Sequence, residues 1–201
     1  MNLPNKLTIF RIILVPIMVI IPYLNIQGNF MGVPITMLII DAIFIIASIT
    51  DKLDGYIARK NNQVTVFGKF LDPIADKILV LSAMIILVEF GKIPSWIPII
   101  VIFREFVVSG YRLIAVQANG NVIAASMWGK IKTTTQMIAV IMAFLDTYNF
   151  ADCILGNIEQ MSFAWLFNAI TSIMLLICVI ATIFSGFDYI KKGKDLLLED
   201  M

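Results

Sequence analysis

Long apolar runs, separated by short polar stretches, dominate this chain. Six of them approach the length of a membrane-spanning helix, and they cover about residues 7–24, 34–51, 70–90, 95–117, 132–149 and 161–187. About 20 consecutive apolar residues suffice for a helix to cross the hydrocarbon core of a bilayer. The alternation of polar and apolar residues that is typical of a lipid-facing β-barrel is missing. The pattern therefore predicts an all-α integral membrane protein with six transmembrane helices.

The composition agrees with this pattern. Hydrophobic residues make up 60% of the chain and charged residues 14%, and the mean hydropathy is +0.92. A soluble core of this size does not need so much apolar surface, so residues 1–201 are expected to form a single membrane domain. The opening segment, residues 2–11, is polar enough to lie along the membrane interface. It lacks a small-residue cleavage site and is therefore expected to remain as part of the first helix.

The placement of charges predicts the orientation in the membrane. If the N-terminus is cytoplasmic, the segments on that side carry Lys6, Arg11, Lys52, Arg59, Lys60, Lys69, Lys77, Lys130, Lys132, Lys191, Lys192 and Lys194. The opposite loops carry Lys92 with the acids Glu89, Asp146, Asp152 and Glu159. Lys and Arg gather in cytoplasmic loops. Both termini are therefore expected in the cytoplasm.

The residue types exclude several chemistries. The chain has no histidine, the commonest general base and metal ligand. Its two cysteines, Cys153 and Cys178, lie far apart in an outer loop and the last apolar run, and indicate neither a thiolate metal site nor a catalytic thiol. Acid–base or metal chemistry would have to use carboxylates.

Four aspartates stand at the ends of two consecutive apolar runs. Asp51 and Asp54 are three residues apart, and Asp72 and Asp76 are four apart, so each pair shares one helix face. Two antiparallel neighbours joined by a short loop bring these faces together, and four like charges there need cations to neutralise them. Ligands made only of oxygen favour Mg²⁺ or Mn²⁺. Four carboxylates can hold two such ions, which suits a phosphoryl displacement.

Small and basic residues lie beside these acids. Gly55 and Ala58 leave room for a phosphate group to approach the helix backbone, and Gly68 could do the same from the other side. Arg59 offers a planar fork for phosphate oxygens.

A simpler interpretation exists for each acid alone. Aspartates at helix ends are often caps or solvated boundary residues. Asp72 followed by Pro73 would suit an N-cap with proline at the first helical position.

The spacing of these residues resembles a known family motif. Asp51-x2-Asp54-Gly55-x2-Ala58-Arg59-x8-Gly68-x3-Asp72-x3-Asp76 matches, position for position, that of the CDP-alcohol phosphotransferases. The resemblance implies a six-helix, usually dimeric membrane enzyme with two divalent metals at its cytoplasmic face. Such enzymes transfer a phosphatidyl or similar group from a CDP-linked donor to an alcohol and release CMP. No nucleic-acid partner is expected.

The resemblance also assigns roles to the motif residues. It implies that the metals are held by Asp51, Asp54, Asp72 and Asp76. Asp76 would in addition be the base for the acceptor hydroxyl. The CDP moiety would be framed by Asp54, Gly55, Ala58, Arg59 and Gly68.

Basic residues in the fourth and fifth runs predict a site for a second anion. Arg104 and Arg112 are eight residues apart and project from similar helix faces, while Lys130 and Lys132 open the fifth run at the same membrane boundary. Cations beside an acidic, metal-filled cleft suit an acceptor that carries a phosphate. Either lysine could instead reflect the positive-inside bias alone. Arg104 could instead pair with an acid such as Glu105.

Three longer segments indicate one particular group within this family. "NLPNKLTIFR", "REFVVSGYR" and "VIAASMWGKIKTTTQM" are similar to bacterial phosphatidylglycerophosphate synthases, from residue 2 to about 140. This implies a multi-pass protein of the bacterial cell membrane that joins CDP-diacylglycerol to sn-glycerol-3-phosphate and releases CMP. The acceptor phosphate would be bound first by Arg112 and Lys130, then by Lys132, Ser109 and Arg104. The nucleotide side would be closed by Asn5, Thr8 and Arg11.

Other functions stay open at this point. Inositol phosphate or phosphatidylglycerol could replace glycerol-3-phosphate as acceptor. A small cation transporter also places acids in its spans, although such sites lie near the midplane at a repeat interface. A structural membrane subunit would use its charges for topology alone. Asp41, inside the second run, would be a hydrogen-bonded buried residue or mark a water-filled cavity.

Overall fold

The protein is a helical bundle. The computed structural model describes residues 2–60, 66–119, 127–156 and 158–198. The helices are α1 (Leu3–Ile20), α2 (Ile35–Lys60), α3 (Val66–Glu89), α4 (Trp96–Asn119), α5 (Met127–Leu145), α6 (Asp152–Leu155) and α7 (Phe163–Leu198), with a 3₁₀ turn η1 (Ile21–Leu24) after α1. Strands β1 (Asn29–Phe30) and β2 (Val33–Pro34) pair as a short antiparallel hairpin.

The predicted helical class is confirmed. Each of the six apolar runs coincides largely with one long helix. Among the described residues, two segments are long and apolar enough to cross a membrane by length and composition, Asn5–Leu24 and Phe163–Lys191. Their mean hydropathies are 2.3 and 2.4.

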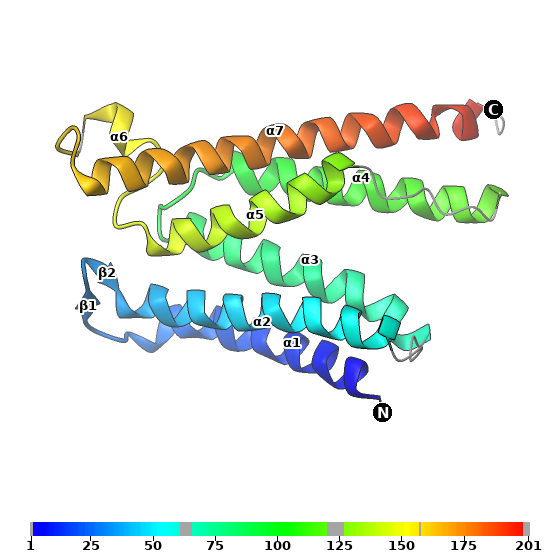
Figure 1. Cartoon of the computed structure of the whole chain (residues 1–201), viewed down its shortest axis with the longest axis horizontal. Coiled ribbons are helices and arrows are strands. Elements are labelled where there is room, and N and C mark those ends of the chain that lie inside the picture. The colour runs from blue at the N-terminus through cyan, green and yellow to red at the C-terminus, as the bar shows by residue number, and fades with distance from the viewer. Residues whose placement is uncertain (1, 61–65, 120–126, 157, 199–201) are drawn as a thin grey trace.

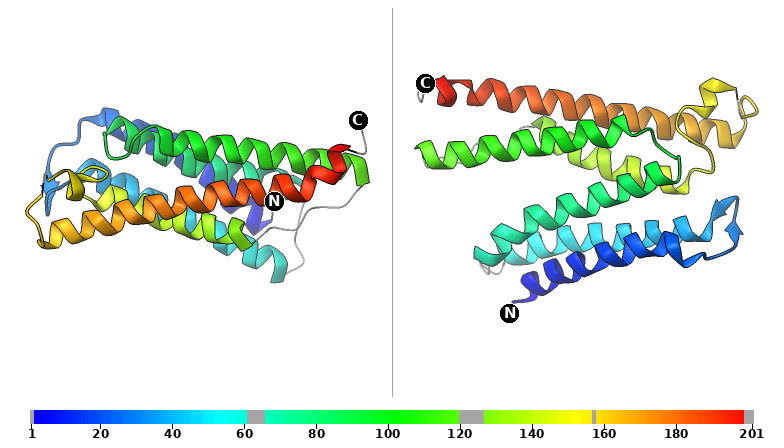
Figure 2. Two further views of the ribbon diagram at one scale, coloured as in Figure 1. Left: turned by 90° about the horizontal axis from the view of Figure 1, so that it is seen from above. Right: turned by 180° about the vertical axis from the view of Figure 1, so that it is seen from behind.

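The long helices lie side by side, with their ends gathered at two poles. Figure 1 shows the N-terminus, the C-terminus, the last turns of α2 and α4 and the first turns of α3 and α5 at one pole. The β1–β2 hairpin and α6 lie at the opposite pole, in both views of Figure 2 as well. We call these the termini pole and the hairpin pole.

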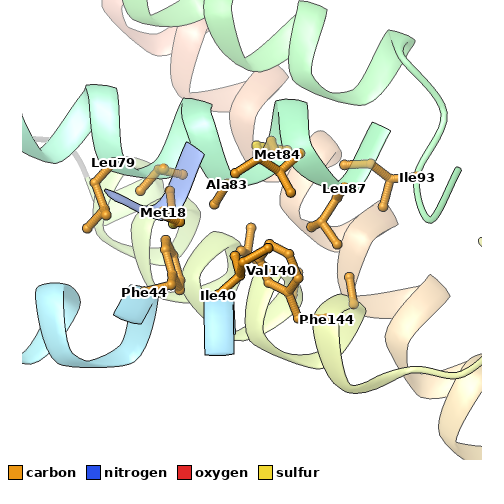
Figure 3. Close-up of a cluster of buried hydrophobic side chains, with 14 of the residues drawn as sticks. Met18, Ile40, Phe44, Leu79, Ala83, Met84, Leu87, Ile93, Val140 and Phe144 are labelled. Atoms are coloured by element: carbon orange, nitrogen blue, oxygen red, sulfur yellow. The ribbon is translucent and has the colours of Figure 1, made fainter. Parts of the chain in front are cut away.

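An apolar core joins the helices. α1 packs against α2 and α3, and α5 contacts both α2 and α7, so that α5 links the two halves of the bundle. Figure 3 shows Met18 of α1, Phe44 of α2, Leu79 of α3 and Val140 of α5 in one buried cluster. Large apolar side chains also cover the outside, and Phe103 on α4 is 71% exposed. Such a surface suits a lipid environment better than water.

Several helices extend beyond the apolar runs that predicted them, α2 and α3 among them. α2 continues past Asp51 to Lys60, and α3 begins at Val66, well before Asp72. Asp72 and Pro73 therefore lie inside α3, and their interpretation as an N-cap followed by proline at the first helical position is wrong. A residue before proline tends to avoid the α conformation, but helix packing overrides this local preference here.

A buried polar cluster holds the hairpin pole together. Lys92, in the α3–α4 turn, donates from Nζ to the carbonyl oxygens of Asp146 (2.8 Å) and Tyr148 (3.3 Å). The Asp146 carboxylate accepts from the Tyr148 amide (3.0 Å) and from Nδ2 of Asn168 on α7 (2.9 Å). Burial lowers the pKa of Lys92 and raises the pKa of Asp146 from their ordinary values, although their opposite charges act against both shifts. The cluster thus ties α3, α5 and α7 at this pole.

Replacing Lys92 is expected to weaken the fold. In Lys92→Met the buried carbonyl oxygen of Asp146 and the partly buried one of Tyr148 lose their donor, which should reduce the free energy of unfolding by about 2 kcal/mol. Denaturant unfolding of the detergent-solubilised protein measures this. Lys191→Met, on the exposed surface of α7, is the matched control and should change little. Equal effects of the two substitutions would contradict a stabilising role of the cluster.

Candidate functional site

The first helix contacts two of the predicted metal-binding acids at the termini pole. Arg11, fully buried on α1, forms an ion pair with Asp51 of α2 (2.7 Å between Nη1 and Oδ1). One turn earlier, Thr8 donates from Oγ1 to Oδ1 of Asp72 on α3 (2.7 Å). Asn5 lies on the same face of α1 and is also buried. α1 therefore brings the α2 acid and the α3 acid to one place.

Asp76 has a buried carboxylate oxygen, Oδ1, without a hydrogen-bond partner among the described residues, as does Asp41 of α2. Asp76 lies one turn after Asp72 on α3. The charges of Asp51, Arg11, Lys132 and Glu105 act on it. A buried carboxylate oxygen without a partner is unfavourable, and a cation at this oxygen would remove that cost. The oxygen-only chemistry of these acids suits a hard divalent ion.

Several predicted residues lie outside the described side chains. Asp54, Gly55, Ala58 and Arg59 belong to α2, and Arg112 belongs to α4, but the structure describes only their helical backbone. Gly68, in the first turn of α3, is buried. Among the side chains that are described, no three acids or cysteines gather closely enough to hold a metal ion. The predicted four-aspartate set thus remains a prediction.

A cavity of about 460 Å³ opens beside Asp76. Its walls come from α3, α4, α5 and α7: Pro73, Asp76, Lys77, Val80, Leu81, Val101, Arg104, Glu105, Gly129, Lys130, Lys132, Thr133, Thr134, Gln136, Met137 and Tyr189. Three of the predicted acceptor-side cations, Arg104, Lys130 and Lys132, therefore share one cavity with a predicted metal ligand. The acidic and basic parts of the candidate site are continuous.

Glu105 lies among the cations of this cavity. Its Oε1 lies 2.6 Å from Nζ of Lys132 and 2.8 Å from Nη1 of Arg104, and its Oε2 lies 3.6 Å from Nζ of Lys77. The pairing of Arg104 with Glu105, one of the two interpretations of Arg104, is confirmed. Arg104 also donates to the Ser185 hydroxyl and lies 5.6 Å from the ring centre of Tyr189, both on α7.

Two of the residues predicted to bind the acceptor phosphate, Ser109 and Lys130, take different positions relative to the cavity. Ser109 is not among the described residues that line the cavity; it accepts from Lys77 and donates to the Glu105 carbonyl oxygen (2.6 Å). Lys130 lines the cavity and is exposed, and no described residue pairs with it. A bound anion would therefore meet an accessible ammonium group at Lys130.

The sequence did not indicate three residues of this cavity. The charge pattern marks Lys77 only as a cytoplasmic lysine, although it directly follows Asp76 inside an apolar run. The sequence indicates Glu105 only as a partner of Arg104. Tyr189 lies in the last helix, where no motif draws attention to it, and its ring contact with Arg104 depends on how α7 packs on α4.

Comparison with known proteins identifies one family and several relatives that share one name. The CDP-alcohol phosphatidyltransferase family matches residues 1–184. A protein of Bacillus subtilis (strain 168), named CDP-diacylglycerol–glycerol-3-phosphate 3-phosphatidyltransferase, is 43% identical over 98% of this chain and 97% of its own length. Proteins of the same name from Haemophilus influenzae and Rickettsia bellii are 40% and 36% identical, over 100% and 96% of this chain and 97% and 96% of their own lengths.

Arg11 and Asp51 are expected to be energetically coupled. Arg11→Met leaves the Asp51 carboxylate without its buried partner, whereas adding Asp51→Asn removes the remaining charge. With chelator present, the double variant should therefore be more stable than the sum of the single effects, by about 1–3 kcal/mol. Denaturant unfolding of all four proteins measures the coupling. Arg11→Met combined with Asp41→Asn is the control cycle; a coupling as large there would contradict the specific pair.

Proposed function

Because this chain belongs to the CDP-alcohol phosphatidyltransferase family, we propose that it transfers the phosphatidyl group of CDP-diacylglycerol to sn-glycerol-3-phosphate, giving phosphatidylglycerophosphate and CMP. The names of relatives that match over nearly the whole chain support this reaction. The observation that carries this proposal is that Asp76 lines the same cavity as Arg104, Lys130 and Lys132. One side suits a metal-bound diphosphate and the other suits a phosphorylated alcohol.

The acidic side would hold the donor. Asp51, Asp54, Asp72 and Asp76 would bind two ions, Mg²⁺ or Mn²⁺, and the buried open oxygen of Asp76 fits such a role. When bound, the ions neutralise the diphosphate and the departing CMP. The Asp76 carboxylate takes the proton of the acceptor's primary hydroxyl, whose oxygen attacks the phosphorus that carries diacylglycerol. Arg11 and Thr8 keep the Asp51 and Asp72 carboxylates oriented before the ions bind.

The nucleotide would lie against α1 and the glycine-containing turns of α2 and α3. The residues assigned to it are Asn5, Thr8, Asp54, Gly55, Ala58, Arg59 and Gly68. Support comes from the described members: Asn5 and Thr8 are buried on the face of α1 that meets the acids, and Gly68 is buried at the start of α3. This position leaves the cavity itself to the acceptor.

The basic side would hold the acceptor phosphate. Lys130 and Lys132 of α5 and Arg104 of α4 line the cavity, while Arg112 and Ser109 are assigned to the same phosphate from the sequence. Asp76 lines the same cavity, so a phosphate group bound here would share that cavity with it. The geometry favours an acceptor with an anionic group over an uncharged or zwitterionic alcohol.

The membrane arrangement follows from the position of the site. We assign six transmembrane spans to α1, α2, α3, α4, α5 and α7, residues 2–11 to the interface and both termini to the cytoplasm of a bacterial cell. The first turns of α1, α3 and α5 and the last turns of α2 and α7, to which most of the predicted cytoplasmic lysines belong, lie toward the termini pole. A lipid donor keeps its acyl chains in the bilayer while its headgroup reaches this boundary. The whole chain acts as one domain, and the active form is a homodimer.

Acceptor choice tests the proposal. Purified protein in detergent, given CDP-diacylglycerol and Mg²⁺, should release CMP with glycerol-3-phosphate and give at least about tenfold less with inositol phosphate, serine or phosphatidylglycerol. Chromatography of CMP and of the lipid product measures turnover. Turnover with a different acceptor would overturn the assignment of the basic side but keep the transfer chemistry. Absence of CMP with every acceptor would overturn the enzyme assignment.

Loss of one acid should abolish turnover without unfolding the protein. Asp72→Asn removes a proposed metal ligand while preserving side-chain volume, and is expected to lower kcat about a hundredfold or more. Chelation of divalent ions should abolish CMP release and readdition of Mn²⁺ or Mg²⁺ should restore it. Asp41→Asn, a buried acid on α2 outside the site, is the matched control. Full activity of Asp72→Asn would contradict the metal assignment.

A further inference from the structure

One carboxylate organises the basic wall of the cavity. Glu105 contacts Lys132, Arg104 and Lys77, which come from α5, α4 and α3. Its side chain is 13% exposed. All three cations lie within 4 Å of its carboxylate oxygens. Neither the family motif nor the names of the relatives assigns a role to this residue.

The contacts of Glu105 fix side chains that would otherwise be mobile. Lysine and arginine lose much rotamer freedom when they are held in one conformation. Glu105 holds the ammonium group of Lys132, which is buried, and the guanidinium of Arg104, which Ser185 and Tyr189 hold from the other side. Because this ordering is complete before an anion arrives, the binding of the anion does not bear its entropic cost.

The charges of the cavity wall suit a phosphate monoester. The described lining contains four cations, Lys77, Arg104, Lys130 and Lys132, and two carboxylates, Asp76 and Glu105. Before any metal ion binds at Asp76, the formal surplus is two positive charges. A phosphate monoester carries close to two negative charges at neutral pH, so the balance is closest to neutral when one such group is bound. Without the charge of Glu105, the like charges of the buried Lys132 and of Arg104 would repel each other.

We propose that Glu105 is the positioning residue of the acceptor subsite, which holds Lys132 and Arg104 in place to bind the phosphate of a phosphorylated alcohol. The inference rests on the proposed function for the identity of the acceptor. Glu105 does not touch the acceptor's phosphate, since two anions repel each other; it acts through Lys132 and Arg104. The opposite role, in which Glu105 occupies the cations as a competitor of phosphate, predicts the opposite sign of the effect.

Binding and kinetics of three variants test this inference: Glu105→Gln, Lys132→Met and the combination of the two. In Glu105→Gln, the Kd for inorganic phosphate and for glycerol-3-phosphate, from calorimetry of the detergent-solubilised protein, should rise about tenfold or more. The KM for glycerol-3-phosphate should rise in parallel, while the KM for CDP-diacylglycerol stays within about twofold of wild type. Glu105→Gln combined with Lys132→Met should bind no more weakly than Lys132→Met alone, because Glu105 acts through that lysine.

Two further variants keep the test decisive. Glu105→Asp retains the charge, and with it the fold, but is one methylene shorter; it should raise the Kd for phosphate about threefold even if Glu105→Gln does not fold. Glu89→Gln, an exposed acid at the last turn of α3, is the control and should leave every constant unchanged.

Three results would overturn the inference. Unchanged phosphate binding in Glu105→Gln and Glu105→Asp would show that Glu105 has no role in phosphate binding. Tighter phosphate binding in Glu105→Gln would show that Glu105 competes with phosphate for Lys132 and Arg104. Fully additive losses in the double variant would show that it does not act through Lys132. If wild-type protein releases no CMP with any alcohol, the proposed function fails by itself, and the binding of inorganic phosphate still decides the role of Glu105.

Discussion

At the termini pole, Arg11 and Glu105 lie inside the apolar bundle beside groups of opposite charge, and these contacts shape that pole. A charge within a membrane-spanning helix is unfavourable unless it faces a partner or a polar cavity. Arg11 and Asp51 meet this requirement across α1 and α2. Glu105 meets it with cations from three helices. These pairs join α1 to α2, and α4 to α3 and α5. Glu105 and its cation partners line the cavity beside Asp76.

The two ends of the bundle use buried polar groups differently. At the hairpin pole, Lys92 and Asp146 are satisfied by backbone and side-chain partners and join helix ends. At the termini pole, Asp76 keeps an open buried oxygen, and Lys130 reaches the cavity without a described partner. Polar groups that remain open are available to a ligand. The hairpin pole is thus held by satisfied polar contacts. The termini pole keeps polar groups that can bind a substrate entering from the membrane boundary.

Much of this arrangement could be predicted from the sequence, because some features depend only on local pattern. Apolar runs set the six long helices, and the spacing of the aspartates pointed to the correct ends of α2 and α3. The start of α3 was not predictable from Asp72 and Pro73, since packing overrides the local preference of the residue before proline. The partners of Glu105 and the contact of Tyr189 with Arg104 come from four different helices. Their distances depend on helix register, which a linear pattern does not contain.

The central claim is that acidic and basic groups of one cavity bring a metal-bound donor and a phosphorylated acceptor together. A crystal structure of the protein with Mn²⁺ and glycerol-3-phosphate, using the anomalous scattering of manganese, tests it most directly. The account predicts manganese peaks against Asp72 and Asp76, with the acceptor's phosphate against Lys132 and its free hydroxyl toward Asp76. Manganese away from these aspartates, or a phosphate outside the cavity, would contradict it.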